Sequence, residues 1–225
     1  MGGGVDPPFP RVFEASDHGI YRAIVMELFD CDLRALLSHS AHAQTSATII
    51  YQIALALKFL HRSVSIMHLD VSVRNILWQK LAKRAVLADF SLATIFPATK
   101  LRAATCCAPN YRPPELLFLE PRTIAMNLIN PAIDLWSFGC GLWEIIASEV
   151  EPFEHMMLGN EEKLIKANMT AYMLDIKSEF SPWSRRLSKA GEWKYALNSR
   201  VHKRQDARDL SKIWRAFGNA ERERQ

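Results

Sequence analysis

Cysteine is scarce in this chain of 225 residues, which has four cysteines in all: Cys31, Cys106, Cys107 and Cys140. None of them forms a Cys-x-x-Cys pair, so their spacing indicates neither a zinc site nor a disulfide framework. The absence of such a framework fits a reducing compartment. We therefore expect a cytoplasmic or nuclear location.

Long hydrophobic runs are also missing. The two longest apolar stretches, 49–60 and 135–147, are shorter than the roughly 20 residues that cross a bilayer, and polar residues interrupt both. They predict two buried helices and no membrane span. Near the start, Asp6 stands where a myristoylation motif needs Ser or Thr, and no signal-peptide pattern is visible, so we expect neither a lipid anchor nor a secretory signal.

The net charge of +4 is unevenly distributed, because residues 185–225 hold 12 Lys and Arg against 5 Asp and Glu. Such a basic region could bind RNA, an anionic membrane or an acidic partner. No stacking aromatic residues interleave with these charges in a nucleic-acid motif. A solvated helical surface is the favoured interpretation, and we do not expect a nucleic-acid partner.

The N-terminal part of the chain has the pattern of a β-hairpin. Residues 1–10 are rich in glycine and proline, which predicts a loose segment. The strand-like runs 11–15 and 21–27 follow, and the turn-forming residues 16–19 separate them.

Helical spacing begins after the hairpin. Three leucines predict a short helix at 33–37, and a longer helix containing 49–60 is predicted to begin near Thr45 or Ser46 as its N-cap.

Two β-rich pieces are predicted next, at 75–78 and 85–88. The irregular stretch 89–114 comes after them, and such a stretch inside a compact domain is usually functional. A second buried helix is predicted at 133–147. Its apolar face comprises Leu135, Phe138, Leu142 and Ile145.

Four short motifs occur in one order along the chain. They are His68-Leu69-Asp70-Val71-Ser72-Val73-Arg74-Asn75, Asp89-Phe90-Ser91, Tyr111-Arg112-Pro113-Pro114-Glu115 and Asp134-Leu135-Trp136-Ser137-Phe138-Gly139. This order resembles the catalytic loop, metal-binding triplet, activation-segment end and central helix of eukaryotic-type protein kinases. The spacings resemble those of the family too, with 19 positions from Asp70 to Asp89 and 26 from Asp89 to Glu115.

The resemblance implies an α+β, protein-kinase-like fold with a mostly helical C-terminal lobe and a remnant β-hairpin of the N-terminal lobe. The kinase domain would occupy 11–217, with a partial N-terminal lobe at 11–29 and the C-terminal lobe at 30–217. Residues 218–225 would form a charged tail.

The resemblance also implies ATP and Mg²⁺ as cofactors. Phosphoryl transfer needs positioning, charge neutralisation, a carboxylate that accepts the hydroxyl proton, and oxygen ligands for magnesium. By resemblance Asp70 is the catalytic base, Asn75 is a magnesium ligand, and Asp89 bridges metal and phosphate.

Residues 24–33 resemble the hinge between the two kinase lobes. Backbone groups of Glu27 and Phe29 would bond adenine, and Met26 would be the gatekeeper. Asp32 would contact the ribose and Leu77 would form the adenine floor. The alternative is a strand that simply runs into a helix, and the hinge interpretation depends on the downstream motifs.

Three further residues resemble structural positions of the family. Glu115 is similar to the glutamate that pairs with a late arginine, here Arg204, and Asp134 would hold the catalytic-loop backbone from beneath. Residues 111–117 and 159–164 are similar to the cyclin-dependent and MAP-kinase-like group.

The chain departs from the family pattern in several places. No Gly-x-Gly-x-x-Gly loop, strand lysine or helix glutamate can be placed before Met26, and the first lysine is Lys58. Four positions carry residues unlike the usual ones, namely Leu69 for arginine, Ser72 for lysine, Ser91 for glycine and Ala108 for threonine. Arg74 either supplies the phosphate-binding charge that Ser72 lacks or is an ordinary surface cation.

Three functions fit this pattern. The first is an ATP- and Mg²⁺-dependent Ser/Thr kinase acting on a protein substrate, with weak or absent turnover in the chain as written. The second is a pseudokinase that binds a protein partner without turnover. The third, a basic nucleic-acid module, rests on the charge of 185–225 alone.

Overall fold

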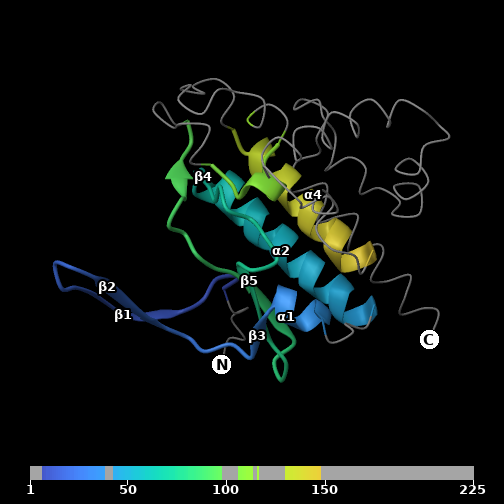
Figure 1. Ribbon diagram of the computed structural model, residues 1–225, viewed down its shortest axis with the longest axis horizontal. Coiled ribbons are helices and arrows are strands. Elements are labelled where there is room, and N and C mark those ends of the chain that lie inside the picture. Colours follow the sequence, from blue (N-terminus) through green and yellow to red (C-terminus); the bar gives the residue numbers. More distant parts are fainter. Residues whose placement is uncertain (1–6, 39–42, 98–105, 114–115, 117–129, 148–225) are drawn as a thin grey trace, which may run out of the picture.

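The computed structural model describes residues 7–38, 43–97, 106–113, 116 and 130–147. Two long helices lie side by side, small antiparallel sheets lie beside them, and a β-hairpin projects away from this body (Figure 1). The predicted α+β class is confirmed.

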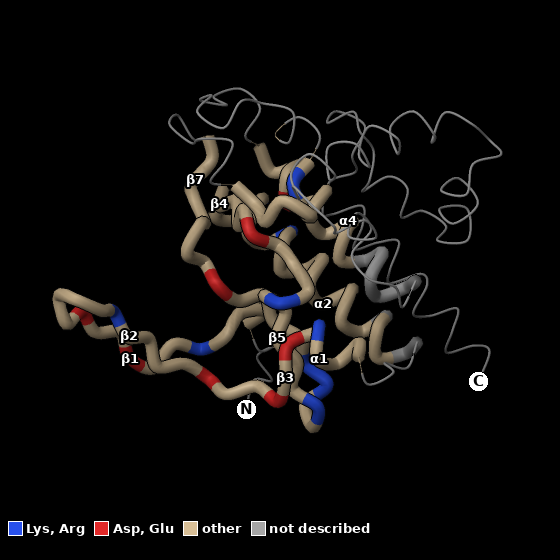
Figure 2. The backbone as a smooth tube through the Cα atoms, viewed as in Figure 1, with Lys and Arg blue, Asp and Glu red and all other residues tan. Residues whose placement is uncertain are grey.

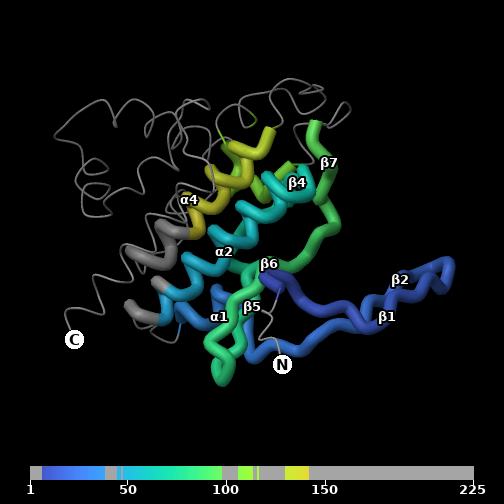
Figure 3. Tube along the Cα trace, turned by 180° about the vertical axis from the view of Figure 1, so that it is seen from behind, coloured from blue at the N-terminus to red at the C-terminus, as the bar shows by residue number. Residues whose placement is uncertain are grey.

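The hairpin consists of β1 (Val12–Asp17) and β2 (Arg22–Met26), and it extends away from the helices in both views of the chain (Figures 1 and 3). Gly19 makes the turn with a left-handed φ of 79°, and its N–H donates to Asp17 Oδ1 over 2.9 Å. The predicted hairpin is therefore confirmed, but the turn lies two residues later than expected because Ser16 and Asp17 pair in the ladder with Ala23 and Arg22.

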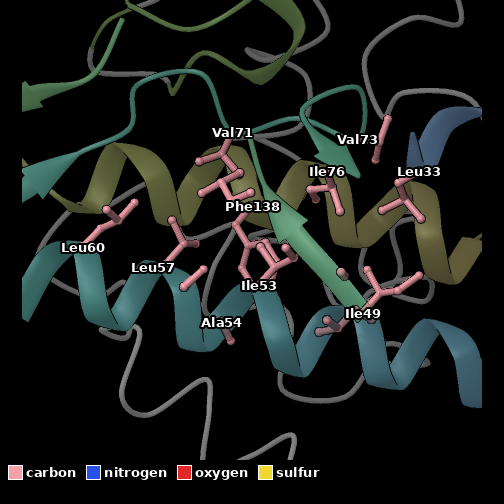
Figure 4. Packing of buried hydrophobic residues seen from close by; sticks show 14 of the residues in the cluster. Leu33, Ile49, Ile53, Ala54, Leu57, Leu60, Val71, Val73, Ile76 and Phe138 are labelled. Atoms are coloured by element: carbon pink, nitrogen blue, oxygen red, sulfur yellow. The ribbon is translucent and has the colours of Figure 1, made fainter. Parts of the chain in front are cut away.

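The core lies between α2 (Ala43–Ser63) and α4 (Ala132–Ala147). Ile53, Leu57 and Phe138 point into the space between these helices, and all are buried (Figure 4). Burying such side chains is worth about 1.5–3 kcal/mol each. Both predicted helices are confirmed.

The start of α2 corrects one prediction. The helix begins at Ala43, so Thr45 and Ser46 lie inside its first turns and do not cap it. Ala43 and Gln44 are good helix formers, which explains why the helix extends past the residues chosen as caps. In α4, the side chains of Leu142 and Ile145 lie outside the described part of the chain.

A three-stranded antiparallel sheet has the order β3–β5–β6, with β3 at Cys31–Asp32, β5 at Ile76–Gln79 and β6 at Arg84–Leu87. β5 and β6 each lie within one residue of the predicted pieces. Gln52 of α2 holds the β5–β6 turn: its Nε2 donates to Lys83 O over 3.1 Å, and its Oε1 accepts from Ala85 N–H over 2.6 Å. The short helix α1 (Leu33–Ser38) follows β3 directly, as predicted.

Where the structure describes it, at 89–97 and 106–113, the stretch predicted to be irregular contains two short elements. β7 (Thr94–Ile95) pairs with β4 (Ile66–Met67), and a 3₁₀ turn, η2, spans Pro109–Tyr111. Two-residue strands are too short to show a hydrophobic period, which explains why the sequence did not predict them. Among the described residues, no helix is both long and apolar enough to cross a membrane.

Candidate active site

The loop between β4 and β5 is held from beneath by Asp134, at the first turn of α4. The backbone N–H of His68 donates to Asp134 Oδ2 and that of Leu69 donates to Oδ1, both over 2.8 Å. His61 Nε2 lies 2.8 Å from Oδ2 of the same carboxylate. Asp134, expected to hold the loop backbone, is thus a buried acceptor for three donors on two elements.

The carboxylate of Asp134 stays ionised despite its burial. Burial by itself raises its pKa, but the hydrogen bond and charge of His61, together with the His68 N–H, bring the pKa below its usual value. A charged acceptor makes hydrogen bonds stronger than neutral ones, so the loop has a firm anchor.

Asp70 and Asn75 converge within the loop. Asn75 Nδ2 donates to both Asp70 O and Asp70 Oδ2, each over 2.8 Å. The N–H of Asn75 donates to Ser72 O over 3.1 Å, and Asn75 O accepts from Ala88 N–H over 2.8 Å. The loop therefore closes on itself and is tied to the chain just before Asp89.

His68 links the loop to the same segment from the other side. Its Nε2 lies 3.0 Å from the carbonyl oxygen of Ala88, an acceptor, so Nε2 carries the proton and Nδ1 accepts from Asp70 N–H over 3.3 Å. Burial is the main cause that lowers the pKa of His68, which is neutral at pH 7. The sequence motif contains His68 but gives no signal for this bridging role.

Asp89 follows β6 and is exposed, with a left-handed φ of 60°. Its Oδ1 accepts from Ser91 N–H over 3.2 Å. The ring of Phe90 lies edge-on to His68 at 4.8 Å and to Phe9 at 5.5 Å between centroids. Packing of the Phe90 ring against these two rings therefore fixes the direction of the segment, while the carboxylate of Asp89 remains accessible.

The residues proposed as metal ligands have suitable chemistry. Because both donor contacts of the Asn75 amide go to Asp70, its oxygen remains as an acceptor, and Asp89 adds a carboxylate with one oxygen outside the Ser91 bond. These are the hard oxygen ligands that Mg²⁺ prefers. In the described residues no three His, Cys, Asp or Glu side chains gather as a metal site, so phosphate oxygens and water would have to complete the shell.

The predicted hinge runs from the end of β2 to β3. Met26 pairs with Val12, and the N–H of Glu27 donates to Arg11 O over 2.9 Å. Among the described residues, neither the carbonyl of Glu27 nor the N–H of Phe29 has a hydrogen-bond partner. Glu27 and Phe29 are the two residues whose backbone groups are expected to bond adenine.

Asp32 and Leu77, predicted to meet the ribose and the adenine, face each other across β3 and β5 in register. Asp32 Oδ1 accepts from Ala35 N–H over 2.7 Å, so this side chain also caps α1. Within the described ranges, this is the hydrogen bond that the Asp32 carboxylate accepts. Leu77 is half-buried and pairs on its other side with Val86.

Comparison with known proteins decides the family. A model of the protein kinase domain matches residues 9–213, which is most of the chain. The chain belongs to the protein kinase family.

Several kinases are similar to it. Protein kinase kin1 of Schizosaccharomyces pombe is 28% identical over 176 residues, covering 76% of this chain and 19% of that protein. Serine/threonine-protein kinase PLK4 of Drosophila yakuba is 33% identical over 159 residues, covering 68% and 19%. Serine/threonine-protein kinase RIM11/MSD1 of Saccharomyces cerevisiae is 28% identical over 140 residues, covering 60% and 36%.

The chain thus spans between about a fifth and about a third of the length of these relatives. The matches confirm the kinase domain. The similarity to the cyclin-dependent and MAP-kinase-like group stays a prediction.

Two departures from the kinase pattern have a structural explanation. Leu69, in place of arginine, is buried against an apolar cluster that includes Cys106, Cys107 and Leu116, and its carbonyl accepts from Cys107 N–H over 2.8 Å. Ser91, in place of glycine, is not among the described residues with a positive φ, so its side chain causes no backbone strain here.

The remaining predicted residues are Arg74, Glu115 and Arg204. Arg74 is exposed beside Asn75, and both interpretations of its charge stay open. Glu115 and Arg204 lie outside the described residues, and so does the basic region 185–225. Along the described chain, acidic and basic positions are interspersed (Figure 2).

Proposed function

We propose that this kinase domain binds ATP with Mg²⁺ and is built for phosphoryl transfer to Ser or Thr of a protein. In this proposal adenine pairs with the backbone of Glu27 and Phe29, Asp32 meets the ribose, and Asp70 accepts the proton of the attacking hydroxyl. When bound, the metal neutralises the charge that develops on the phosphate oxygens.

One observation carries the proposal. Asn75 bonds Asp70 through its side chain and the segment before Asp89 through its carbonyl, so a single residue sets the base and the metal carboxylate relative to each other. Positioning is the main contribution that phosphoryl transfer asks of a protein. His68 and Asp134 hold the same loop from behind.

We further propose that residues 1–225 alone have weak or absent turnover. They contain no Gly-x-Gly-x-x-Gly and no lysine before Lys58, and the uncharged Ser72 is buried in the loop. Losing one well-placed electrostatic contact typically slows chemistry by about 10²–10³-fold. These features also favour the second candidate, a pseudokinase whose folded surface binds a partner.

Two measurements on purified residues 1–225 test these proposals. Titration with a fluorescent ATP analogue should show weak, Mg²⁺-dependent binding that disappears in Asp89→Asn. The control Asp17→Asn, which neutralises an exposed hairpin carboxylate, should bind as the wild type does. If the wild type shows no binding at any Mg²⁺ concentration, the proposed nucleotide site is wrong.

A phosphate-transfer assay with a generic Ser/Thr peptide then separates the kinase from the pseudokinase. We expect no measurable transfer. Robust transfer that disappears in both Asp70→Asn and Asp89→Asn, but persists in Asp17→Asn, would contradict the proposal of weak turnover.

A further inference from the structure

Arg84 is a nearly buried cation that none of the catalytic roles uses. It begins β6, and its side chain is 11% exposed. Buried charges are costly unless they are paired and hydrogen-bonded, so a buried arginine at this place calls for an explanation.

The guanidinium of Arg84 joins two segments that are distant in sequence. Its Nη1 forms an ion pair with Glu27 Oε1 of the hinge, and its Nη2 donates to the carbonyl oxygens of Pro7 and Phe9, each over 3.1 Å. It also lies over the ring of Phe29, with 5.6 Å from Cζ to the ring centroid. Arg84 therefore contacts both Glu27 and Phe29, the two residues predicted to bond adenine.

The strand that carries Arg84 also leads to the metal-binding carboxylate. At its far end, Leu87 N–H donates to Pro8 O over 3.1 Å, and Ala88 N–H donates to Asn75 O over 2.8 Å before the chain reaches Asp89. β6 thus touches the hinge through its first residue and the catalytic loop just past its last residue. A stable contact at Arg84 therefore fixes the position of the hinge relative to the catalytic loop and Asp89.

The chemistry of the contact favours arginine specifically. A planar guanidinium presents five N–H donors in a fixed fork, whereas a lysine ammonium is a compact charge with three donors, so lysine suits a carboxylate and two carbonyls less well. Burial by itself raises the pKa of Glu27, but the hydrogen bond and charge of Arg84, helped by Arg11, lower it overall. Glu27 is therefore ionised at neutral pH and remains a full partner.

We propose that Arg84 is a positioning residue for nucleotide binding, which holds the hinge backbone of Glu27 and Phe29 in register with Asp89. This inference rests on the proposed function, and it adds a residue that the kinase motifs do not include. Because Arg84 touches no reacting atom, its loss should weaken nucleotide affinity by lowering the fraction of the chain whose hinge is correctly placed.

The test compares Arg84→Met, Arg84→Lys and Glu27→Gln with the wild type and with Arg22→Met. Arg22 is a matched control because it also bonds a carboxylate, Asp17, but on the exposed hairpin. Each variant is titrated with Mg-ADP, which binds without turnover. Far-ultraviolet circular dichroism confirms that it is folded.

We expect Kd to rise about tenfold in Arg84→Met, which is the scale of a lost charge-assisted hydrogen bond. Arg84→Lys and Glu27→Gln should show smaller rises, and Arg22→Met none. The double variant Arg84→Met with Glu27→Gln should bind no more weakly than Arg84→Met alone, because both changes remove the same contact.

Amide hydrogen exchange gives a second readout that needs no nucleotide. The N–H groups of Glu27 and Leu87 bond Arg11 O and Pro8 O, so both should exchange faster in Arg84→Met and not in Arg22→Met. Unchanged exchange would show that Arg84 does not hold these segments in place, and would overturn the proposal. Faster exchange with unchanged Kd would reduce Arg84 to a structural role and overturn the proposal.

A wild type that fails to bind Mg-ADP would contradict the proposed function and this role together. The exchange result would still show whether Arg84 holds the hinge and the N-terminal segment in place, so the two failures are distinguishable.

Discussion

The hairpin and the helical body of this domain are stabilised in different ways. In the body, α2, α4 and the small sheet bury a continuous apolar core, and the catalytic loop is hydrogen-bonded to it on several sides. In the hairpin, apolar residues on both strands face solvent: Phe13 is 64% exposed and Ile24 is 66% exposed. An isolated two-stranded ribbon of this kind is marginally stable by itself.

The difference separates two parts of the proposed nucleotide site. Asp70, Asn75 and Asp89 are positioned by the body. The hinge connects the body to the hairpin, and its Glu27 forms an ion pair with Arg84. Substitutions should therefore have large effects in the body and small ones in the hairpin.

The largest effect is expected in the core. Leu57→Ala or Phe138→Ala should lower the free energy of unfolding by about 2–5 kcal/mol, because each leaves a cavity between α2 and α4. Urea denaturation followed by circular dichroism measures this. Leu81→Ala is the control, since Leu81 is 100% exposed. A loss well below about 1 kcal/mol at both core sites would show that these helices do not form the core.

The next effect concerns the anchor of the catalytic loop. His61→Leu should lower the free energy of unfolding by about 1.5–3 kcal/mol, because a buried carboxylate loses one of its donors. The comparison is His18→Leu in the exposed hairpin, for which we expect a change within about 0.5 kcal/mol. Equal effects of the two changes in the same denaturation assay would remove the distinction between body and hairpin.

A pH dependence should follow from His68. Because burial lowers the pKa of His68 in the folded domain, the unfolded chain takes up a proton first as the pH falls through about 6.5. The contribution of neutral His68 to the free energy of unfolding is therefore fully present above that pH. It declines below that pH, by at most about 1.4 kcal/mol per pH unit, until the pH passes the folded-state pKa of His68.

The measurement is the free energy of unfolding between pH 8 and pH 5, the span around the reference value of about 6.5. His68→Phe should flatten the curve, whereas His18→Phe should leave its slope unchanged. A wild-type curve that is already flat would contradict the assigned neutral state of His68.

The smallest effect is expected in the hairpin. Ile24→Ala should change the free energy of unfolding by less than about 0.5 kcal/mol, because its side chain gains little from folding in the described structure. A loss as large as that of Leu57→Ala would mean that this surface is covered in solution, and a concentration series would show whether a second copy covers it.

Local patterns predicted the local parts of this structure. The hairpin, the buried helices and the pieces at β5 and β6 follow from periodicity and turn residues. Asp70 and Asn75 were placed in one site by their resemblance to the kinase catalytic loop, and the structure joins them by two hydrogen bonds. The class of fold followed from motif order alone.

Contacts between distant segments could not be predicted in the same way. His61 meets Asp134 from 73 positions away, and Arg84 meets Glu27 from 57 positions away. Neither histidine nor arginine shows from its neighbours in sequence that it will be buried. Such pairs depend on how α2, α4 and β6 pack, and a single sequence contains no direct record of that packing.

The left-handed backbone at Leu69, with φ of 62°, has a consequence for sequence variation. Leucine disfavours this conformation by about 1–2 kcal/mol, and here the bonds to Asp134 and Cys107 N–H hold it in place. A branched Cβ would add to the clash. In a library of all substitutions at this position, valine, isoleucine and threonine should be depleted relative to methionine, which is of similar hydrophobicity. Backbone conformation, as well as burial, would then restrict which residues this position tolerates.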